Sequence, residues 1–196
     1  GKFPKILDDE VVGTHAKQLY SDAKAMLESI VAEKWITANG IIGFYPANSQ
    51  GDDILVYQDE TRSQVVERLC HLREQKDKAN SNPNYCLSDY IAPEQSGLTD
   101  YVGGFAVGAG FGIEARIAQY DADHDDYNSI MLKALADRLA EAFAEKLHEL
   151  VRQELWGYAS SEAWSNDELI AEKYQGIRPA PGYPACPDHT EKAKLW

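Results

Sequence analysis

A proline-rich segment close to the C-terminal end carries the residues best suited to hold a ligand. Residues 178–187 read Arg-Pro-Ala-Pro-Gly-Tyr-Pro-Ala-Cys-Pro and contain four of the eight prolines of the chain. Because proline fixes φ and lacks an N–H, this segment can form neither a helix nor a central strand. We therefore expect an extended, stiff backbone that loses little entropy when a ligand binds.

Three residues of this segment indicate the kind of ligand. Arg178 offers a planar guanidinium that suits a carboxylate. Gly182 lets a ligand approach the backbone closely, and Tyr183 supplies a flat ring with a hydroxyl. The segment thus favours a small ligand that is flat in one part and carries a carboxylate in another. The alternative is a rigid structural connector.

Two other motifs give weaker signals. Gly108, Gly110 and Gly112 follow an expected strand, but Ile113 stands where the dinucleotide-binding fingerprint needs its last glycine. We interpret these glycines as a connection. Cys186 and His189 have the spacing of metal ligands, but no second matched pair lies nearby, so no metal site is predicted.

Acidic side chains provide a further candidate group. Asp137 and Glu141 lie four residues apart and share one face of an expected helix, and Glu172 lies on a shorter one. Charged residues surround them in the sequence. Spacing alone therefore predicts a solvated surface for all three acids.

The elements that must position these residues follow from hydrophobic periodicity. Asp8 or Asp9 is expected to cap the first helix, Ser165 and Glu168 form a capping box, and Gly176 is expected to end the last helix. A hairpin is expected with its turn at 48–53, and a polar loop at 76–84. Helices are predicted over 10–34, 61–72, 125–156 and 168–175, and strands over 41–47, 54–57 and 101–107.

This order of elements predicts an α+β fold with an antiparallel sheet. A doubly wound parallel sheet is disfavoured because strands and helices do not alternate regularly.

Charge and composition exclude several classes of partner. The 196 residues include 32 acidic and 19 basic side chains, which gives a net charge of -13. This charge repels nucleic acid and anionic membrane surfaces, and no apolar run approaches the roughly 18 residues of a membrane span. Three cysteines at irregular spacing fit reduced thiols. We therefore expect a cytoplasmic protein without a nucleic-acid or membrane partner.

Several segments in matching order resemble the activation domain of cobalamin-dependent methionine synthase. The strongest match is the stretch from Arg178 to Lys192, and the similarity extends over nearly the whole chain. The other matching segments are 32–39, 51–54, 59–62, 84–87, 124–128, 133–145 and 174–178.

The resemblance implies a curved α+β domain with a twisted antiparallel sheet and long flanking helices. In that family the whole enzyme moves a methyl group from methyltetrahydrofolate through cobalamin to homocysteine. Its C-terminal domain binds S-adenosylmethionine and docks over the cobalamin-binding domain. There, with an electron from flavodoxin or a flavoprotein reductase, it supports remethylation of inactive cob(II)alamin. The chain by itself would have no turnover.

The resemblance also assigns roles to individual residues. Arg178 would hold the carboxylate of S-adenosylmethionine, and the backbone of Ala180, Gly182 and Tyr183 would cradle the ligand, with Tyr183 near the corrin. Glu141 and Glu172 would line the site, and Asp137 would face the cobalamin-binding domain. For these three acids the resemblance replaces the solvated-surface interpretation.

The sequence departs from the family pattern at both ends. The family's Asp-Trp-x-x-Phe-like segment, which holds the ligand's amino group, and a later Tyr of the site are missing. We therefore expect residues 1–196 to form a single, truncated domain with an exposed sheet edge and weakened S-adenosylmethionine binding. Two alternatives stay open, namely a stand-alone module of a shorter cobalamin-reactivation system and a purely structural brace at 178–192.

Overall fold

The computed structural model describes residues 3–78 and 82–195. The chain divides into two compact units. The helical unit comprises Gly1–Ile41 and Ala106–Glu149, and the sheet unit comprises Ile42–Phe105 and Leu150–Trp196. Strands β1 (Thr37–Gln50) and β4 (Asp100–Phe111) each contribute residues to both units.

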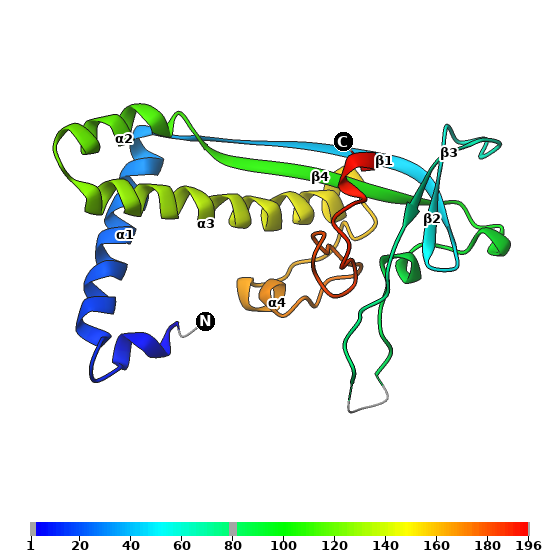
Figure 1. The fold of residues 1–196 in the computed structure, drawn as a ribbon, viewed down its shortest axis with the longest axis horizontal. Coiled ribbons are helices and arrows are strands. Elements are labelled where there is room, and N and C mark those ends of the chain that lie inside the picture. Colours follow the sequence, from blue (N-terminus) through cyan, green and yellow to red (C-terminus); the bar gives the residue numbers. More distant parts are fainter. Residues whose placement is uncertain (1–2, 79–81, 196) are drawn as a thin grey trace. The chain divides into compact units, whose positions relative to one another are not determined.

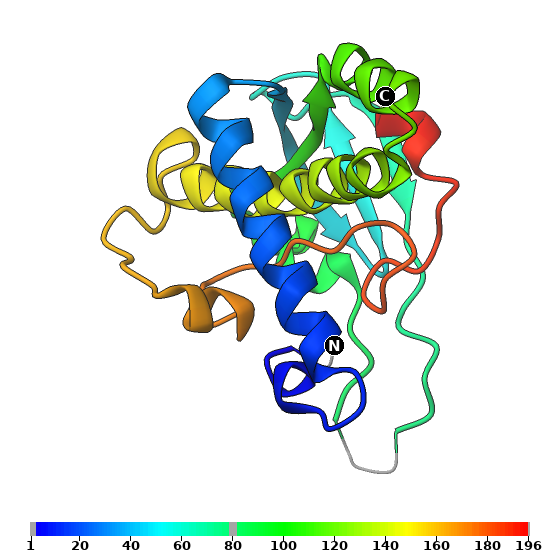
Figure 2. The same cartoon turned by 90° about the vertical axis from the view of Figure 1, so that its left-hand side faces the viewer.

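Three helices build the helical unit, after a short 3-10 turn η1 (Lys5–Asp8). They are α1 (Gly13–Glu33), α2 (Ile113–Ala122) and α3 (Asp126–Leu150). Helix α1 crosses α3 (Figure 2), and the side chains buried between them form the core of this unit. These buried residues are Met26, Ile30, Met131 and Leu132.

Neither Asp8 nor Asp9 caps α1 as predicted, because Val12 occupies the N-cap position and no side chain of the described residues caps the helix. Asp9 Oδ1 accepts the backbone N–H groups of Val11 and Val12 at 2.9 and 3.0 Å, just before the helix begins. Lys34 ends the helix in the left-handed conformation, with φ 54°.

Helix α2 was not predicted, although its apolar spacing was visible. Ile113, Ile117 and Tyr120 recur at intervals of four and three residues and pack on the core of the helical unit. Gly112, with φ 95°, precedes the helix, whereas Gly108 and Gly110 belong to β4. The interpretation of all three glycines as a connection is therefore wrong for Gly108 and Gly110.

The sheet contains four strands in the order β3-β2-β1-β4 (Figure 1). Strand β2 (Asp53–Tyr57) pairs antiparallel with β1 and with β3 (Val65–Cys70). Ile54 lies opposite Leu69, and Val56 lies opposite Ala47, so that their side chains form one buried cluster. The predicted α+β class and the hairpin are both confirmed, with β1 continuing to Gln50.

The predicted helix over 61–72 is wrong, because this segment contains β3. Val65 and Val66 are β-branched, and Leu69 is buried against the central strand β2. Pairing with β2 engages the backbone of this segment and buries Leu69, which overrides its weak helical periodicity.

Short helices complete the sheet unit. They are the 3-10 turns η2 (Leu87–Tyr90) and η3 (Glu94–Ser96), the π-helix η4 (Val151–Leu155), α4 (Asn166–Ile170) and α5 (Lys192–Leu195). The helix predicted over 125–156 is thus confirmed, but its last turn is a π-helix. The capping box of Ser165 and Glu168 is also confirmed. Helix α4 nevertheless ends at Ile170, well before Gly176.

The C-terminal segment covers the outer edge of β3. Glu191 Oε2 accepts the N–H of Cys70 at 3.0 Å, and Lys194 Nζ donates to the carbonyl of Arg68 at 2.7 Å. These bonds occupy backbone groups that β2 does not reach. The polar loop expected at 76–84 lies partly outside the described residues. None of the helices in 3–78 and 82–195 is long and apolar enough to cross a membrane.

Candidate ligand-binding site

The proline-rich segment forms a tight turn and not the extended strip that was predicted. The N–H of Gly182 donates to the carbonyl of Cys186 at 2.8 Å, and the N–H of Tyr183 donates to that of Ala180 at 3.1 Å. Tyr183 and Cys186 form an isolated antiparallel bridge. Backbone pairing between residues only a few positions apart closes the turn, which composition alone did not reveal.

Gly182 is required by this turn for two reasons. Its φ is 99°, a conformation that side-chain-bearing residues rarely adopt. A Cβ added here would also lie 2.5 Å from Nε2 of His189. The group that approaches Gly182 in the structure is the imidazole of His189, so the predicted close approach of a ligand stays a prediction.

The turn leaves specific backbone groups accessible. Within residues 3–78 and 82–195, no hydrogen bond engages the N–H of Ala180 or the carbonyl of Gly182. Ala180, Gly182 and Tyr183 are all exposed, and Arg178 is half-buried. The four predicted residues of this segment thus lie on one turn, which leaves the N–H of Ala180 and the carbonyl of Gly182 available within the described residues.

The downstream end of the turn is anchored in the core of the sheet unit. Ala185 and Cys186 are buried, and the carbonyl of Ala185 accepts the N–H of Leu87 at 3.0 Å. Cys186 Sγ lies 3.8 Å from Nδ1 of His71. Burial raises the pKa of the Cys186 thiol and lowers the pKa of His71, so both groups are held in their neutral forms.

Cys186 therefore faces His71 and not His189, with which it has metal-ligand spacing in the sequence. In the part of the chain that the structure describes, no three His, Cys, Asp or Glu side chains gather as metal ligands would.

The upstream end is anchored by aromatic residues. Tyr174 is buried, and the guanidinium of Arg152 lies 4.1 Å from its ring centroid. Tyr158 Oη donates to the carbonyl of Gln175 at 3.3 Å. Sequence patterns did not identify Arg152 or Tyr158, because their partners lie far away in the chain.

Glu172 lies in the same unit, just beyond α4. It is exposed and adopts the left-handed conformation with φ 52°, and its N–H donates to the carbonyl of Leu169 at 3.0 Å. Burial, together with the charges of Tyr85, Asp89 and Glu172, raises the pKa of Tyr90. Glu172 thus takes the helix-ending role that was predicted for Gly176.

Asp137 and Glu141 lie on α3 in the helical unit, on one face as predicted. Both are joined to the intervening Arg138, whose Nη2 lies 2.5 Å from Asp137 Oδ2 and whose Nη1 lies 3.0 Å from Glu141 Oε2. All three side chains are exposed. Arg138 was missed, although its spacing of three residues from Glu141 was a usable signal.

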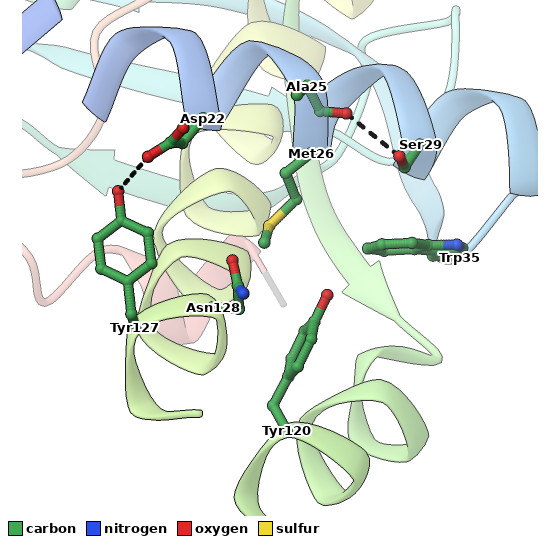
Figure 3. Close-up of a pocket in the computed structure, with 8 residues that line it drawn as sticks. All are labelled: Asp22, Ala25, Met26, Ser29, Trp35, Tyr120, Tyr127 and Asn128. Atoms are coloured by element: carbon green, nitrogen blue, oxygen red, sulfur yellow. Dashed lines mark hydrogen bonds between the residues drawn. The ribbon is translucent and has the colours of Figure 1, made fainter. Parts of the chain in front are cut away.

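An open hollow of about 450 Å³ in the helical unit contains none of the predicted residues (Figure 3). Several of its polar groups bond to one another, since Tyr127 Oη donates to Asp22 Oδ2 at 2.8 Å and Ser29 Oγ donates to the carbonyl of Ala25 at 3.2 Å. The Arg116 guanidinium already lies 4.1 Å from the ring centroid of Trp35. The side chains that line the hollow therefore offer less to a ligand than the turn at 178–187 does.

Comparison with known proteins gives two agreeing results. The family described as "Vitamin B12 dependent methionine synthase, activation domain" matches residues 1–196. A crystal structure of the MetH reactivation domain bound to AdoHcy is similar to this chain, with a TM-score of 0.86 and 58% sequence identity. The match covers 100% of this chain and 60% of that one.

Proposed function

Because this chain belongs to the family of vitamin B12-dependent methionine synthase activation domains, we propose that it binds S-adenosylmethionine and supports reductive remethylation of cobalamin. One observation carries this proposal: the closed turn that holds Arg178 beside a free backbone donor and a free acceptor. The AdoHcy in the similar crystal structure supports the same ligand class. The family match over the whole chain favours this reading over a stand-alone module.

The turn fits the polar groups of S-adenosylmethionine. The half-buried Arg178 guanidinium pairs with the ligand carboxylate, because a planar fork matches two carboxylate oxygens. The N–H of Ala180 donates to the ligand and the carbonyl of Gly182 accepts from it. The exposed ring of Tyr183 supplies a flat surface close to the bound corrin.

The three acidic residues have two roles: two of them stabilise the positive charge of the ligand, and the third faces the partner domain. Glu172 and Glu141 balance the sulfonium, which carries a full positive charge that a carboxylate stabilises. Asp137 faces the cobalamin-binding domain when the two domains dock. Arg138 must then release both Asp137 and Glu141, because it pairs with them in the structure.

The residues of this chain act by binding and orienting. The neighbouring domain of the full enzyme would hold cobalamin, and the reduced cofactor would supply the nucleophile, with flavodoxin or a flavoprotein reductase as the electron donor. Moving a methyl group from a sulfonium needs no general acid or base, so Arg178 and the turn contribute proximity and orientation. The chain works as part of a methyltransferase of the cytoplasm and has no turnover alone.

Arg178→Ala tests the ligand assignment. Calorimetric titration with S-adenosylmethionine should show binding weakened by about tenfold or more, since one charge-assisted, bidentate contact is lost. Arg68→Ala is the matched control, because Arg68 is an exposed arginine of the sheet unit that pairs with Asp53. If Arg178→Ala bound the ligand normally and only lost stability, the segment would be a structural brace.

A further inference from the structure

A buried ion pair contacts Tyr174, four residues before Arg178. Arg152 is fully buried, and its Nε and Nη2 lie 2.8 and 2.7 Å from Oε1 of Glu162. The Glu162 side chain is only 6% exposed. Burying two charges costs desolvation energy that an apolar pair of similar size would avoid. The presence of this pair therefore indicates a function other than packing of the core.

Arg152 lies within the π-helix η4. The N–H of Trp156 donates to the carbonyl of Val151 at 2.9 Å, which is the five-residue spacing of a π-helix. One extra residue in the turn rotates the side chains that follow relative to the preceding α-helix. The carbonyl of Arg152 also accepts the N–H of Ala159 at 2.9 Å, so this residue fixes the loop that leads to Glu162.

Two aromatic residues connect this region to the segment before Arg178: Tyr174 lies against the ion pair, and Tyr158 holds the backbone at Gln175. The Arg152 guanidinium lies 4.1 Å from the ring centroid of Tyr174, which is buried. Tyr158 Oη holds the carbonyl of Gln175, and a Cβ added to Gly176 would lie 2.9 Å from that same oxygen. Three consecutive residues are thus located by this network, and Arg178 follows two positions later.

The two ends of the turn are held by different groups. Cys186, with His71 and Leu87 nearby, fixes the downstream end, whereas the ion pair and Tyr158 fix the upstream end. Loss of the upstream anchor would therefore shift Arg178 while the backbone from Gly182 to Cys186 stays in place.

We infer that the Arg152–Glu162 ion pair positions Arg178 for the carboxylate of S-adenosylmethionine, acting through Tyr174, while Tyr158 holds the adjoining backbone at Gln175. This inference rests on the proposed function. Arg152, Glu162, Tyr158 and Tyr174 are positioning residues, since they act through the backbone of residues 174–178.

Three variants test this role by calorimetric titration with S-adenosylmethionine. Tyr174→Leu removes the ring beneath the guanidinium and should weaken binding by about tenfold, the size expected for a desolvated cation–π contact. Tyr174→Phe keeps the ring and should restore affinity to within about threefold. Tyr158→Phe deletes only a hydroxyl on a partly exposed ring, and should weaken binding by about threefold through loss of one hydrogen bond.

A core substitution separates positioning from stability. Leu69 is buried in the sheet and lies outside the network, so Leu69→Ala should lower the unfolding midpoint but leave affinity within about twofold. All titrations are run at a temperature where each variant is fully folded. If Leu69→Ala weakened binding as much as Tyr174→Leu, or if Tyr174→Leu bound normally, the positioning role would be wrong.

Hydrogen exchange without ligand distinguishes this inference from the proposed function. In Tyr174→Leu the amides of Glu172 and Lys173, which donate to the carbonyls of Leu169 and Glu168, should exchange faster, while the amides of Gly182 and Cys186 keep their protection. If the wild-type protein failed to bind S-adenosylmethionine, the proposed function would fall. Hydrogen exchange alone would then test whether Tyr174 anchors this segment. Faster exchange confined to the segment would support the anchoring, and an exchange pattern equal to that of the wild type would overturn it.

Discussion

Glu172 holds a backbone conformation that glycine adopts more readily. Its φ of 52° places it in the left-handed region, immediately beyond α4. A left-handed residue commonly follows the last turn of a helix, as Lys34 does after α1. The conformation of Glu172 therefore follows from ending α4, and a binding role for its carboxylate needs its own test.

Replacing Glu172 by glycine should separate stability from binding. The left-handed conformation costs about 1–2 kcal/mol for a residue with a Cβ, and glycine avoids this cost. About half of that stabilisation is lost again, because glycine also increases the entropy of the unfolded chain. Glu172→Gly should therefore raise the free energy of unfolding by about 0.5–1 kcal/mol in chemical denaturation, and weaken S-adenosylmethionine binding.

Lys34 provides the matched control for that variant, because it has a φ of 54° at the end of α1. Lys34→Gly should stabilise the protein by a similar amount and leave the affinity for the ligand unchanged. Equal affinity in wild type and Glu172→Gly would count against a binding role for Glu172.

Gly182→Ala should destabilise the turn for two reasons: alanine rarely adopts the φ of this position, and its Cβ would lie too close to His189. Gly51 has φ 65° and open space around it, so Gly51→Ala measures the conformational cost alone, about 1 kcal/mol. Gly182→Ala should lose more, because its Cβ would meet His189. Adding His189→Ala should recover the difference in the free energy of unfolding. Equal losses at the two glycines would show that the imidazole simply moves aside.

At the scale of single elements, local signals predicted more than long-range ones did. Ser165 and Glu168 satisfy each other within one helical turn, so the capping box could be read directly from the sequence. The segment containing Val65 and Leu69 became a strand only because β2 offered a partner. The π-helix could not be predicted either, since it keeps the apolar spacing of the α-helix before it.

The contact between β3 and the C-terminal segment predicts a pH dependence. Burial of His71, opposed by the charges of Glu191, Asp53 and Asp188, lowers its pKa below the ordinary value of about 6.5. As pH falls through that value, the unfolded chain takes up the proton first, so the free energy of unfolding should decrease.

Urea denaturation at pH values between about 7 and 5 measures this effect. The wild-type protein should lose stability over that range, and His71→Gln should show a flatter dependence. A slope that is unchanged in His71→Gln would mean that another group is responsible.

At the scale of the molecule, the net charge of -13 bears on a cationic ligand. Arg138 neutralises Asp137 and Glu141 on the surface of α3, where such pairs contribute up to about 1 kcal/mol. Arg138→Gln should therefore tighten S-adenosylmethionine binding by up to about fivefold. Affinity for the uncharged thioether AdoHcy should stay the same.

Arg116→Gln is the control for net charge, because Arg116 pairs with Glu33 in the same unit. It should change neither affinity in calorimetric titration. If both arginine variants tightened binding equally, the effect would come from overall charge and not from Glu141.

The α+β class and the family could be predicted from the sequence, but the division into two units could not. Strands β1 and β4 continue from one unit into the other without a proline- or serine-rich break, so composition does not change at the boundary. Arg178, Gly182 and Tyr183 could be grouped because they are neighbours in the chain. The pairing of Arg152 with Glu162 and Tyr174 depends on folding and left no local pattern.

The covering of β3 by Glu191 and Lys194 bears on how the protein stays in solution. An uncovered strand edge offers N–H and carbonyl groups to an identical edge on another molecule, which is how β-sheet aggregates begin. The segment with Glu191 and Lys194 thus prevents the edge of β3 from pairing with a second molecule. Proteolytic removal of the residues after Asp188, which include the buried Glu191, would uncover this edge and should promote aggregation.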